Sequence, residues 1–352
     1  MKILVIGGTR FIGPCVVRDL AGLGHEVTVF HRGHSHSEMD QAAEHLHGDR
    51  SALADFIPEF RRLDPDVVLD MLLMNQADAV QLMQTFKGIA GKVVVLSSQD
   101  VYRAYGRLIR TEPGNSGGID GLITEDSPLR QELYPYRGHV GLADKPKAPT
   151  DPLYHYDKIL VERAVMADPD LPGTVLRLPC VYGPGDYQHR MYDYIRRMDD
   201  GRPVILLPEG MYHWRWTRGY VDDVAAAIAL AATDDRAINR IYNCGEKQAL
   251  SEADWVRSIG DAAGWRGEVV HIPSGTQSKF AGPDYDWSNH LETDSIRIRQ
   301  ELGFEEKIDH REAIARTVEW ERAHPPAEID EARFDYAGED ELLRQLGHGT
   351  AR

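Results

Sequence analysis

A short apolar run ending at a glycine-rich turn constrains the fold of this chain most strongly. The run is Lys2-Ile-Leu-Val-Ile6, and its β-branched residues favour a buried strand. The turn Gly7-Gly8-Thr9-Arg10-Phe11-Ile12-Gly13 follows, and the apolar spacing from Phe11 to Leu23 predicts a helix. Strand, glycine turn and helix in this order place backbone amides and a helix N-terminus where they can hold a pyrophosphate. We therefore predict a dinucleotide site that includes Gly7, Thr9, Arg10, Phe11, Ile12 and Gly13.

The rest of the chain alternates strand and helix patterns, which predicts a doubly wound parallel α/β sheet covered on both faces. Strands are predicted at 26–30, 66–69, 92–96 and 173–178. Helices are predicted at 76–86, at 154–166 and at 52–62, the last broken or kinked near Pro58. We predict a dinucleotide-binding domain over 1–178, to which 219–245 returns, and a smaller mixed α/β substrate lobe from 179–218 and 246–330. A tail helix is predicted in 331–352. The glycine- and proline-rich stretch 103–152 is predicted to be a lid or a mobile segment.

Charge and cysteine content limit the partners and the compartment. The chain has 40 Lys and Arg residues and 56 Asp and Glu residues, which gives a net charge of −16. This charge disfavours binding to nucleic acid or to an anionic membrane. The three cysteines form no C-x-x-C pair and fit reduced thiols in the cytoplasm. No apolar run approaches the roughly 20 residues of a membrane-spanning helix. The histidines His31, His34 and His36 lack ligand spacing with any carboxylate or cysteine, so no metal site is predicted.

The residue after the second strand bears on the choice of cofactor. An acid there would bind the ribose 2′-hydroxyl of NAD, but the chain has His31 followed by Arg32. With Arg10 in the turn, two guanidinium groups could meet a ribose 2′-phosphate. We therefore expect NADP in preference to NAD. Asp49 is placed to accept a hydrogen bond from the adenine amino group, although a Gly-Asp pair equally marks an exposed turn.

Two polar clusters predict the chemistry. In Tyr154-His-Tyr-Asp-Lys158, a helix would place Tyr154 and Lys158 on one face. A phenol must lose about three pKa units, roughly 4 kcal/mol, to act as a base near neutrality, and a nearby ammonium group favours that change. Upstream, Ser97 and Ser98 end a predicted strand, and ligands of open α/β sheets bind at the carboxyl ends of strands.

Together these segments resemble the extended short-chain dehydrogenases/reductases of the NAD-dependent epimerase/dehydratase family, which have a Rossmann-like fold. The turn at 7–13, the Y-x-x-x-K pattern at 154–158 and the serine-containing strand end match that family in order. So do Arg177-Leu-Pro-Cys-Val-Tyr-Gly-Pro-Gly185, Val221-Asp-Asp-Val-Ala225 and the segment 294–303.

The resemblance implies a role for each matching residue. Tyr154 would be the general acid and base, and Lys158 would hold the nicotinamide ribose and lower the tyrosine pKa. Ser98 would hydrogen-bond the reacting oxygen, because it stands four residues before Tyr102, as the family serine does before its tyrosine. Pro179 is assigned to the cofactor site.

The resemblance also implies a sugar or nucleotide-sugar substrate between the lobes, and homodimers are common in the family. Asp100, Arg190 and Arg215 are the candidate substrate contacts; His189, Arg196, Arg197 and Arg218 are further cations of the second lobe. Gln99 disfavours a dTDP-glucose 4,6-dehydratase, because those enzymes have aspartate there. Arg10, His31 and the spacing of 56 positions from Ser98 to Tyr154 resemble an atypical branch that includes chloroplast stem-loop RNA-binding proteins. The alternatives to an epimerase or dehydratase are therefore an NADPH-dependent reductase and an RNA-binding protein on the same fold.

Overall fold

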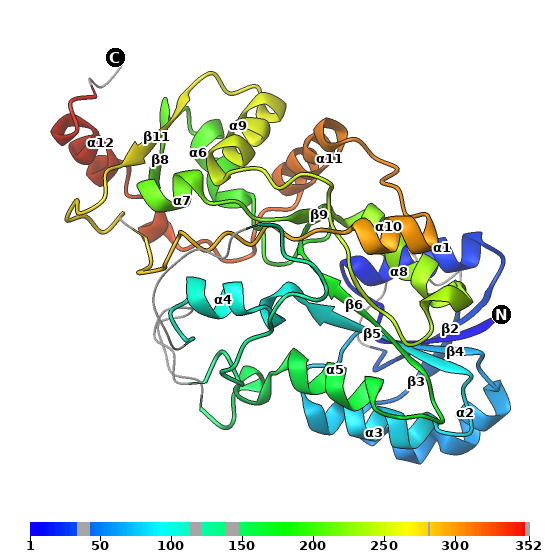
Figure 1. Ribbon diagram of the computed structural model, residues 1–352. Coiled ribbons are helices and arrows are strands. Elements are labelled where there is room, and N and C mark those ends of the chain that lie inside the picture. Colours follow the sequence, from blue (N-terminus) through cyan, green and yellow to red (C-terminus); the bar gives the residue numbers. More distant parts are fainter. Residues whose placement is uncertain (34–42, 113–120, 138–147, 281, 349–352) are drawn as a thin grey trace.

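A seven-stranded parallel sheet forms the centre of the first domain (Figure 1). The computed structural model describes residues 1–33, 43–112, 121–137, 148–280 and 282–348. The strand order is β3-β2-β1-β4-β5-β6-β10, and every neighbouring pair is parallel. The strands are β1 (Lys2–Ile6), β2 (Glu26–His31), β3 (Glu44–His47), β4 (Val67–Asp70), β5 (Lys92–Ser98), β6 (Gly173–Leu178) and β10 (Ile241–Asn243). This order is that of a Rossmann-like doubly wound fold, which confirms the predicted fold class.

Helices cover both faces of the sheet because the strands are apolar on both sides. Ile3 and Val5 of β1 point into the core under one helical layer, whereas Leu4 and Ile6 point into the core under the other. The first layer holds α1 (Ile12–Gly22), α8 (Val221–Thr233) and α10 (Ile296–Leu302). The second holds α2 (Ile57–Leu63), α3 (Gln76–Phe86) and α5 (Lys158–Met166), and lies below the sheet in Figure 1.

The second lobe lies beyond the carboxyl ends of the strands and is built from short strands and helices (Figure 1). Its strands form two parallel pairs, β7 (Cys180–Tyr182) with β9 (Arg218–Tyr220), and β8 (Val204–Pro208) with β11 (Glu268–Ile272). Its helices are α6 (Tyr192–Asp199), α7 (Glu209–His213), α9 (Glu252–Ala263), α11 (His310–Ala323) and α12 (Tyr336–Gln345). The chain thus leaves the sheet after β6, enters this lobe, and returns through α8 to β10.

Part of the stretch 103–152 packs on the carboxyl end of β5. It begins with α4 (Arg103–Leu108), and Tyr102 forms an antiparallel bridge with Leu129. The Arg130 backbone amide donates to the Val101 carbonyl at 2.8 Å. Residues 113–120 and 138–147 of this stretch lie outside the described residues.

Two predicted helices differ from the structure. The 52–62 segment breaks between Phe56 and Ile57, next to the predicted break at Pro58. It is a 3-10 helix, η2 (Arg50–Phe56), followed by α2, which carries Pro58 in its first turn, where proline is tolerated. The 154–166 helix begins at Lys158, preceded by a separate 3-10 turn, η4 (Pro152–His155). Other 3-10 helices among the described residues are η3 (Gln99–Val101), η5 (Asp235–Ala237) and η6 (Glu331–Phe334). In the described part of the chain, no helix has both the length and the apolar character needed to cross a bilayer.

Candidate functional site

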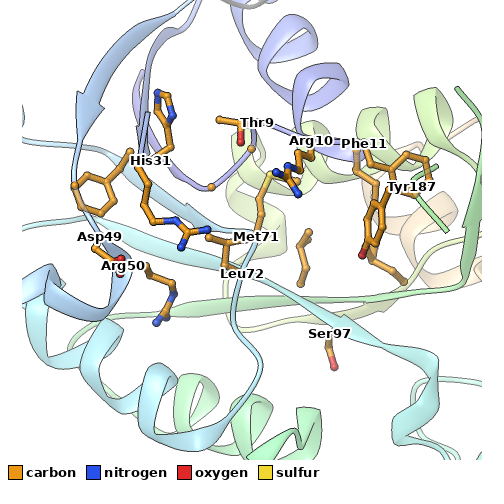
Figure 2. A pocket seen from close by; sticks show the side chains of 18 of the residues that line it. Thr9, Arg10, Phe11, His31, Asp49, Arg50, Met71, Leu72, Ser97 and Tyr187 are labelled. Atoms are coloured by element: carbon orange, nitrogen blue, oxygen red, sulfur yellow. The ribbon is translucent and has the colours of Figure 1, made fainter. Parts of the chain in front are cut away.

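A cavity of about 1000 Å³ lies where the strand order reverses, between the carboxyl ends of β1 and β4 (Figure 2). Such a switch point is where open α/β sheets bind their ligands. The predicted cofactor residues that line it are Gly7, Thr9, Arg10, Phe11, Ile12, His31, Arg32 and Asp49. Gly13 and Pro179 do not line it. Sequence reasoning missed Arg50, Met71, Leu72 and Tyr187, which the fold brings in from other segments.

The glycine turn has a backbone that only glycine adopts readily. Gly7 and Gly8 have φ of 91° and 76°, and a Cβ on Gly7 would lie 2.7 Å from Leu72 Cγ. A Cβ on Gly13 would clash with the Gly8 backbone, so this glycine lets α1 pack closely against the turn. Gly13 therefore shapes the site from behind. The cavity size, the glycine backbone and the helix N-terminus fit a dinucleotide pyrophosphate.

The end of the cavity beside β2 has the charges that would meet the adenosine. Arg10 and Arg32 are both exposed on the cavity wall. His31 lies among other imidazoles, with Nε2 2.8 Å from His45 Nδ1 and its ring 5.0 Å from that of His47. No carboxylate replaces it at the end of β2.

Asp49 caps η2 as well as lining the cavity. Its carboxylate accepts from the Ser51 amide at 2.8 Å and from the Ser51 hydroxyl at 2.7 Å. These hydrogen bonds lower the pKa of Asp49, and the Arg32 charge acts in the same direction. The structure therefore gives Asp49 a structural role as a turn residue, compatible with an adenine contact.

A buried ion pair fixes the loop after β4. Arg50 donates to Asp70 Oδ2 through Nε at 3.0 Å and Nη2 at 2.8 Å, while Asp70 Oδ1 accepts from the Leu72 amide at 2.8 Å. Asp70 is fully buried. The pair holds Leu72 against the glycine turn, and the only signal for it in the sequence was an aspartate at the end of a strand.

Lys158 marks the other end of the cavity. It is the first residue of α5, and its ammonium donates to the Leu96 carbonyl at 2.9 Å and to the Leu73 carbonyl. Burial lowers the pKa of Lys158 to about 8, against the opposing charges of Asp100, Asp70 and Glu162. Lys158 therefore brings a cation to the carboxyl end of β5, where the resemblance places the nicotinamide ribose.

The two serines at the end of β5 differ in their surroundings. The Ser97 hydroxyl donates to the buried Glu162 carboxylate at 2.6 Å, so it is held by the core although it touches the cavity. The Ser98 oxygen accepts from the Asp100 amide at 3.2 Å and caps η3. Ser98 is half-buried and does not line the cavity.

The expected pairing of Tyr154 with Lys158 on one helical face is not present, because Asp157 caps α5 immediately before Lys158. Asp157 Oδ1 accepts from the Ile159 amide at 2.9 Å, and its Oδ2 accepts from the Tyr134 amide at 2.6 Å. Tyr154 instead lies in η4, with the Arg137 guanidinium 4.3 Å from its ring centroid.

Asp100 lies in a cluster of phenols. Its Oδ2 accepts from Tyr156 at 2.7 Å and from Tyr136 at 3.1 Å, and the Arg130 Nε donates to its backbone carbonyl at 2.6 Å. Burial raises the pKa of Asp100, while the Arg130 charge and the phenols oppose that rise.

The predicted cations of the second lobe have protein partners. Arg190 pairs with Asp186 at 2.5 Å, and Arg215 Nη1 donates to the Ala249 carbonyl at 2.9 Å. Arg218 is buried against Glu252. None of the three lines the dinucleotide cavity. No group of three or more His, Cys, Asp or Glu side chains is arranged to hold a metal within the described residues.

A doubly wound sheet with a glycine turn and a long cavity at its switch point defines a nucleotide-binding protein of the Rossmann class. The model of the NAD dependent epimerase/dehydratase family matches residues 3–86 and 132–245. The chain belongs to this family and is an enzyme of the oxidoreductase or isomerase type.

Named relatives are similar over most of the chain. A dTDP-glucose 4,6-dehydratase of Streptomyces niveus is 29% identical over 350 residues, 92% of this chain and 93% of the relative. The 2'-dehydrokanamycin reductase of Streptomyces kanamyceticus is 24% identical over 281 residues, 78% of this chain and 70% of the relative. The solved structure of MoeE5 in complex with UDP-glucuronic acid and NAD superposes with a TM-score of 0.62 at 22% identity, covering 92% of this chain and 99% of MoeE5.

Proposed function

We propose that the protein binds NAD(P) at the switch-point cavity and oxidises a carbinol of a nucleotide sugar, in the manner of an epimerase or dehydratase. One observation carries the proposal. The glycine turn and Lys158 line the same cavity, which ends at the carboxyl end of β5, although Gly7 and Lys158 are 151 positions apart in the sequence. Two similar proteins support the substrate class. One relative is named dTDP-glucose 4,6-dehydratase, and the solved MoeE5 structure is a complex with UDP-glucuronic acid.

When bound, the nicotinamide supplies the hydride acceptor, and the residues of this chain hold and orient the reactants. The turn amides and the N-terminus of α1 would bind the pyrophosphate. Lys158 would hold the nicotinamide ribose, and Ser98 would hydrogen-bond the reacting oxygen. The motif at 154–158 supplies the phenol that moves the proton; by spacing that phenol is Tyr154.

The proposed cofactor is NADP. Arg10 and Arg32 line the cavity without an acid at the end of β2, an arrangement suited to a ribose 2′-phosphate. MoeE5 carries NAD, so the preference rests on these two arginines alone. Measured dissociation constants for NADPH and NADH test it, and equal or tighter binding of NADH contradicts it.

The proposed substrate contacts are Asp100, Arg190 and Arg215. Asp100 follows β5 directly, close to Lys158, whereas both arginines come from the lobe that faces the carboxyl ends of the strands. Arg190 would have to exchange its Asp186 contact for a phosphate. We place the enzyme in the cytoplasm, since all three cysteines are unpaired and burial raises the pKa of each thiol.

The test is a turnover assay with UDP-glucose, UDP-glucuronate and dTDP-glucose, each with NAD⁺ and with NADP⁺. Mass spectrometry detects loss of water, and proton NMR detects an epimer. The proposal expects product from at least one pair, and none from the Lys158→Met variant. The absence of product from every pair with the wild-type enzyme refutes it.

A second candidate, an NADPH-dependent reductase of a sugar-like carbonyl, is favoured by the relative named 2'-dehydrokanamycin reductase. It differs in releasing its cofactor after each cycle. Net consumption of NADPH with a keto-sugar, in the absence of any epimer or dehydrated product, would identify it.

A further inference from the structure

A highly exposed aromatic ring lies on the wall of the dinucleotide cavity. It belongs to Tyr187, which has an exposed fraction of 66%, the highest of any large hydrophobic side chain among the described residues. The motif at 177–185 ends before Tyr187, and the proposed function gives this residue no role. Ligand cavities are lined mainly by apolar and aromatic side chains, which the ligand covers when it binds. The position of Tyr187 therefore indicates a ring that the bound dinucleotide covers.

The backbone on both sides of Tyr187 is anchored in the second lobe. Asp186 is buried, and its Oδ1 accepts from the Gln188 amide at 3.1 Å. The His189 amide donates to the Asp186 carbonyl at 2.9 Å, and His189 Nδ1 lies 2.7 Å from the Glu321 carboxylate of α11. The segment is thus fixed in place, and the Tyr187 side chain can change its position by rotation about its own χ angles.

The Tyr187 ring contacts the glycine turn of the first domain. Its centroid lies 6.4 Å from that of Phe11, and the two ring planes meet at 89°, an edge-to-face contact. Phe11 precedes α1 with φ of 49°, a left-handed conformation that is uncommon for a bulky residue. A Cβ on Gly185 would lie 3.5 Å from Phe11 Cα, so the two lobes approach each other closely here. The ring pair therefore joins the lobes at the wall of the cavity.

This ring pair lies away from the adenosine end of the cavity. Figure 2 shows Phe11 and Tyr187 together, on the opposite side of the cavity from His31 and Asp49. The turn amides, next to Phe11, are the groups that would bind the pyrophosphate. Tyr187 is therefore placed to contact the pyrophosphate and the nicotinamide half of a dinucleotide.

We propose that the Tyr187 ring covers the pyrophosphate and nicotinamide half of the bound dinucleotide and, held by its contact with Phe11, slows release of the cofactor. This inference rests on the proposed function, because it requires a dinucleotide in the switch-point cavity. An epimerase or dehydratase returns the hydride to the sugar, so it must keep the reduced cofactor until the second hydride transfer. A reductase exchanges its cofactor in every cycle. Slow release through Tyr187 therefore favours the epimerase or dehydratase.

The first test measures how fast the reduced dinucleotide leaves the full-length enzyme. The enzyme is loaded with NADPH, or in a parallel series with NADH, and mixed in a stopped-flow instrument with an excess of the oxidised form. The change in nicotinamide fluorescence gives the release rate. We expect Tyr187→Ala to release the cofactor at least about tenfold faster than wild type, equivalent to about 1.4 kcal/mol, and Tyr187→Phe, which keeps the ring, to stay within about threefold.

Gln188→Ala is the matched control, because Gln188 is the exposed neighbour of Tyr187 and does not line the cavity. Its release rate should stay within about twofold of wild type. Release from Tyr187→Ala at the wild-type rate, or from Tyr187→Phe as fast as from Tyr187→Ala, overturns the inference and leaves the proposed function intact. A wild-type enzyme that binds neither NADPH nor NADH overturns the proposed function and this inference with it.

The second test detects the contact in the wild-type enzyme. The protein is labelled with 3-fluorotyrosine, and the ¹⁹F NMR resonance of Tyr187 is assigned from its absence in Tyr187→Phe. Saturation with NAD⁺ or NADP⁺ should shift this resonance, whereas the adenosine half of the same cofactor, 5′-AMP or adenosine 2′,5′-bisphosphate, should leave it in place. A Tyr187 resonance that the bound dinucleotide does not move, or that the adenosine half moves as far, overturns the inference.

Discussion

Replacing Lys158 with methionine should separate the stability of this fold from its function. The Lys158 ammonium is buried at the end of the cavity, and burial lowers its pKa from 10.5 to about 8. Keeping a protonated amine there costs about 3 kcal/mol at pH 7, from 1.36 kcal/mol per pKa unit. Methionine has a similar length without the charge, so it removes this cost together with two hydrogen bonds to carbonyl groups.

The pH dependence gives the clearest signature. Because the native pKa lies below the unfolded one, the unfolded chain holds more protons than the native chain between about pH 8 and pH 10.5. The free energy of unfolding therefore rises with pH. The destabilisation caused by burying the Lys158 ammonium falls from about 3 kcal/mol at pH 7 to below about 1 kcal/mol at pH 10. The lost hydrogen bonds, worth about 1 kcal/mol each, add an offset that changes little with pH.

Urea unfolding of wild type and Lys158→Met at several pH values measures this. We expect the stability of Lys158→Met relative to wild type to decline by roughly 2 kcal/mol from pH 7 to pH 10, while its dinucleotide affinity is reduced throughout. Lys87→Met is the control, because Lys87 is exposed and its hydrogen bonds to Asp170 and Asp168 raise its pKa. The stabilisation that Lys87 contributes to the free energy of unfolding is therefore lost as the pH rises through its pKa. A difference between Lys158→Met and wild type that is constant with pH would refute the reasoning.

Three further changes have distinct expected outcomes. Gly13→Ala forces a Cβ into the Gly8 backbone and should cost about 1–3 kcal/mol in urea unfolding and over tenfold in dinucleotide affinity; wild-type values for both would contradict the packing argument. Arg32→Ala should weaken NADPH about tenfold, roughly 1.4 kcal/mol, and leave NADH within twofold by calorimetry; an equal loss for both argues against a 2′-phosphate contact. Glu162→Gln leaves the buried Arg177 guanidinium without its bidentate partner at 2.8 and 2.9 Å, and should cost about 3–5 kcal/mol; an unchanged unfolding midpoint would show that the pair contributes nothing.

The sequence predicted those features that depend on local pattern. The strand 2–6 and the helix at 76–86 have the predicted bounds. The strand is a continuous apolar run that ends at glycine, and the helix has an amphipathic pattern that begins at Asn75, whose side chain accepts from the Asp78 amide. The position of the glycine turn at the cavity could also be predicted, because strand, glycine turn and helix follow one another directly in the sequence. Family membership and the fold class are confirmed.

Features that depend on tertiary contacts could not be predicted. The start of α5 depends on Asp157, whose Oδ2 also accepts from the Tyr134 amide, a contact that joins segments 23 residues apart. The Asp100–Tyr156 hydrogen bond joins residues 56 positions apart, which no local pattern in the sequence indicates. Likewise Arg50 enters the cavity only because Asp70, 20 residues away, holds it there.

The most direct measurement of the central claim follows the hydrogen of the reacting carbon. The substrates would be UDP-glucose, UDP-glucuronate and dTDP-glucose, each deuterated at C4 of the hexose. Each would be incubated with the enzyme and NAD⁺ or NADP⁺, and the sugar and the dinucleotide would then be analysed by mass spectrometry and NMR. We predict that for at least one sugar the deuterium is found in an epimer, at another carbon of a dehydrated sugar, or in the reduced nicotinamide. If every sugar is recovered unchanged and no deuterium enters the dinucleotide, the assignment of hydride transfer on a nucleotide sugar is wrong.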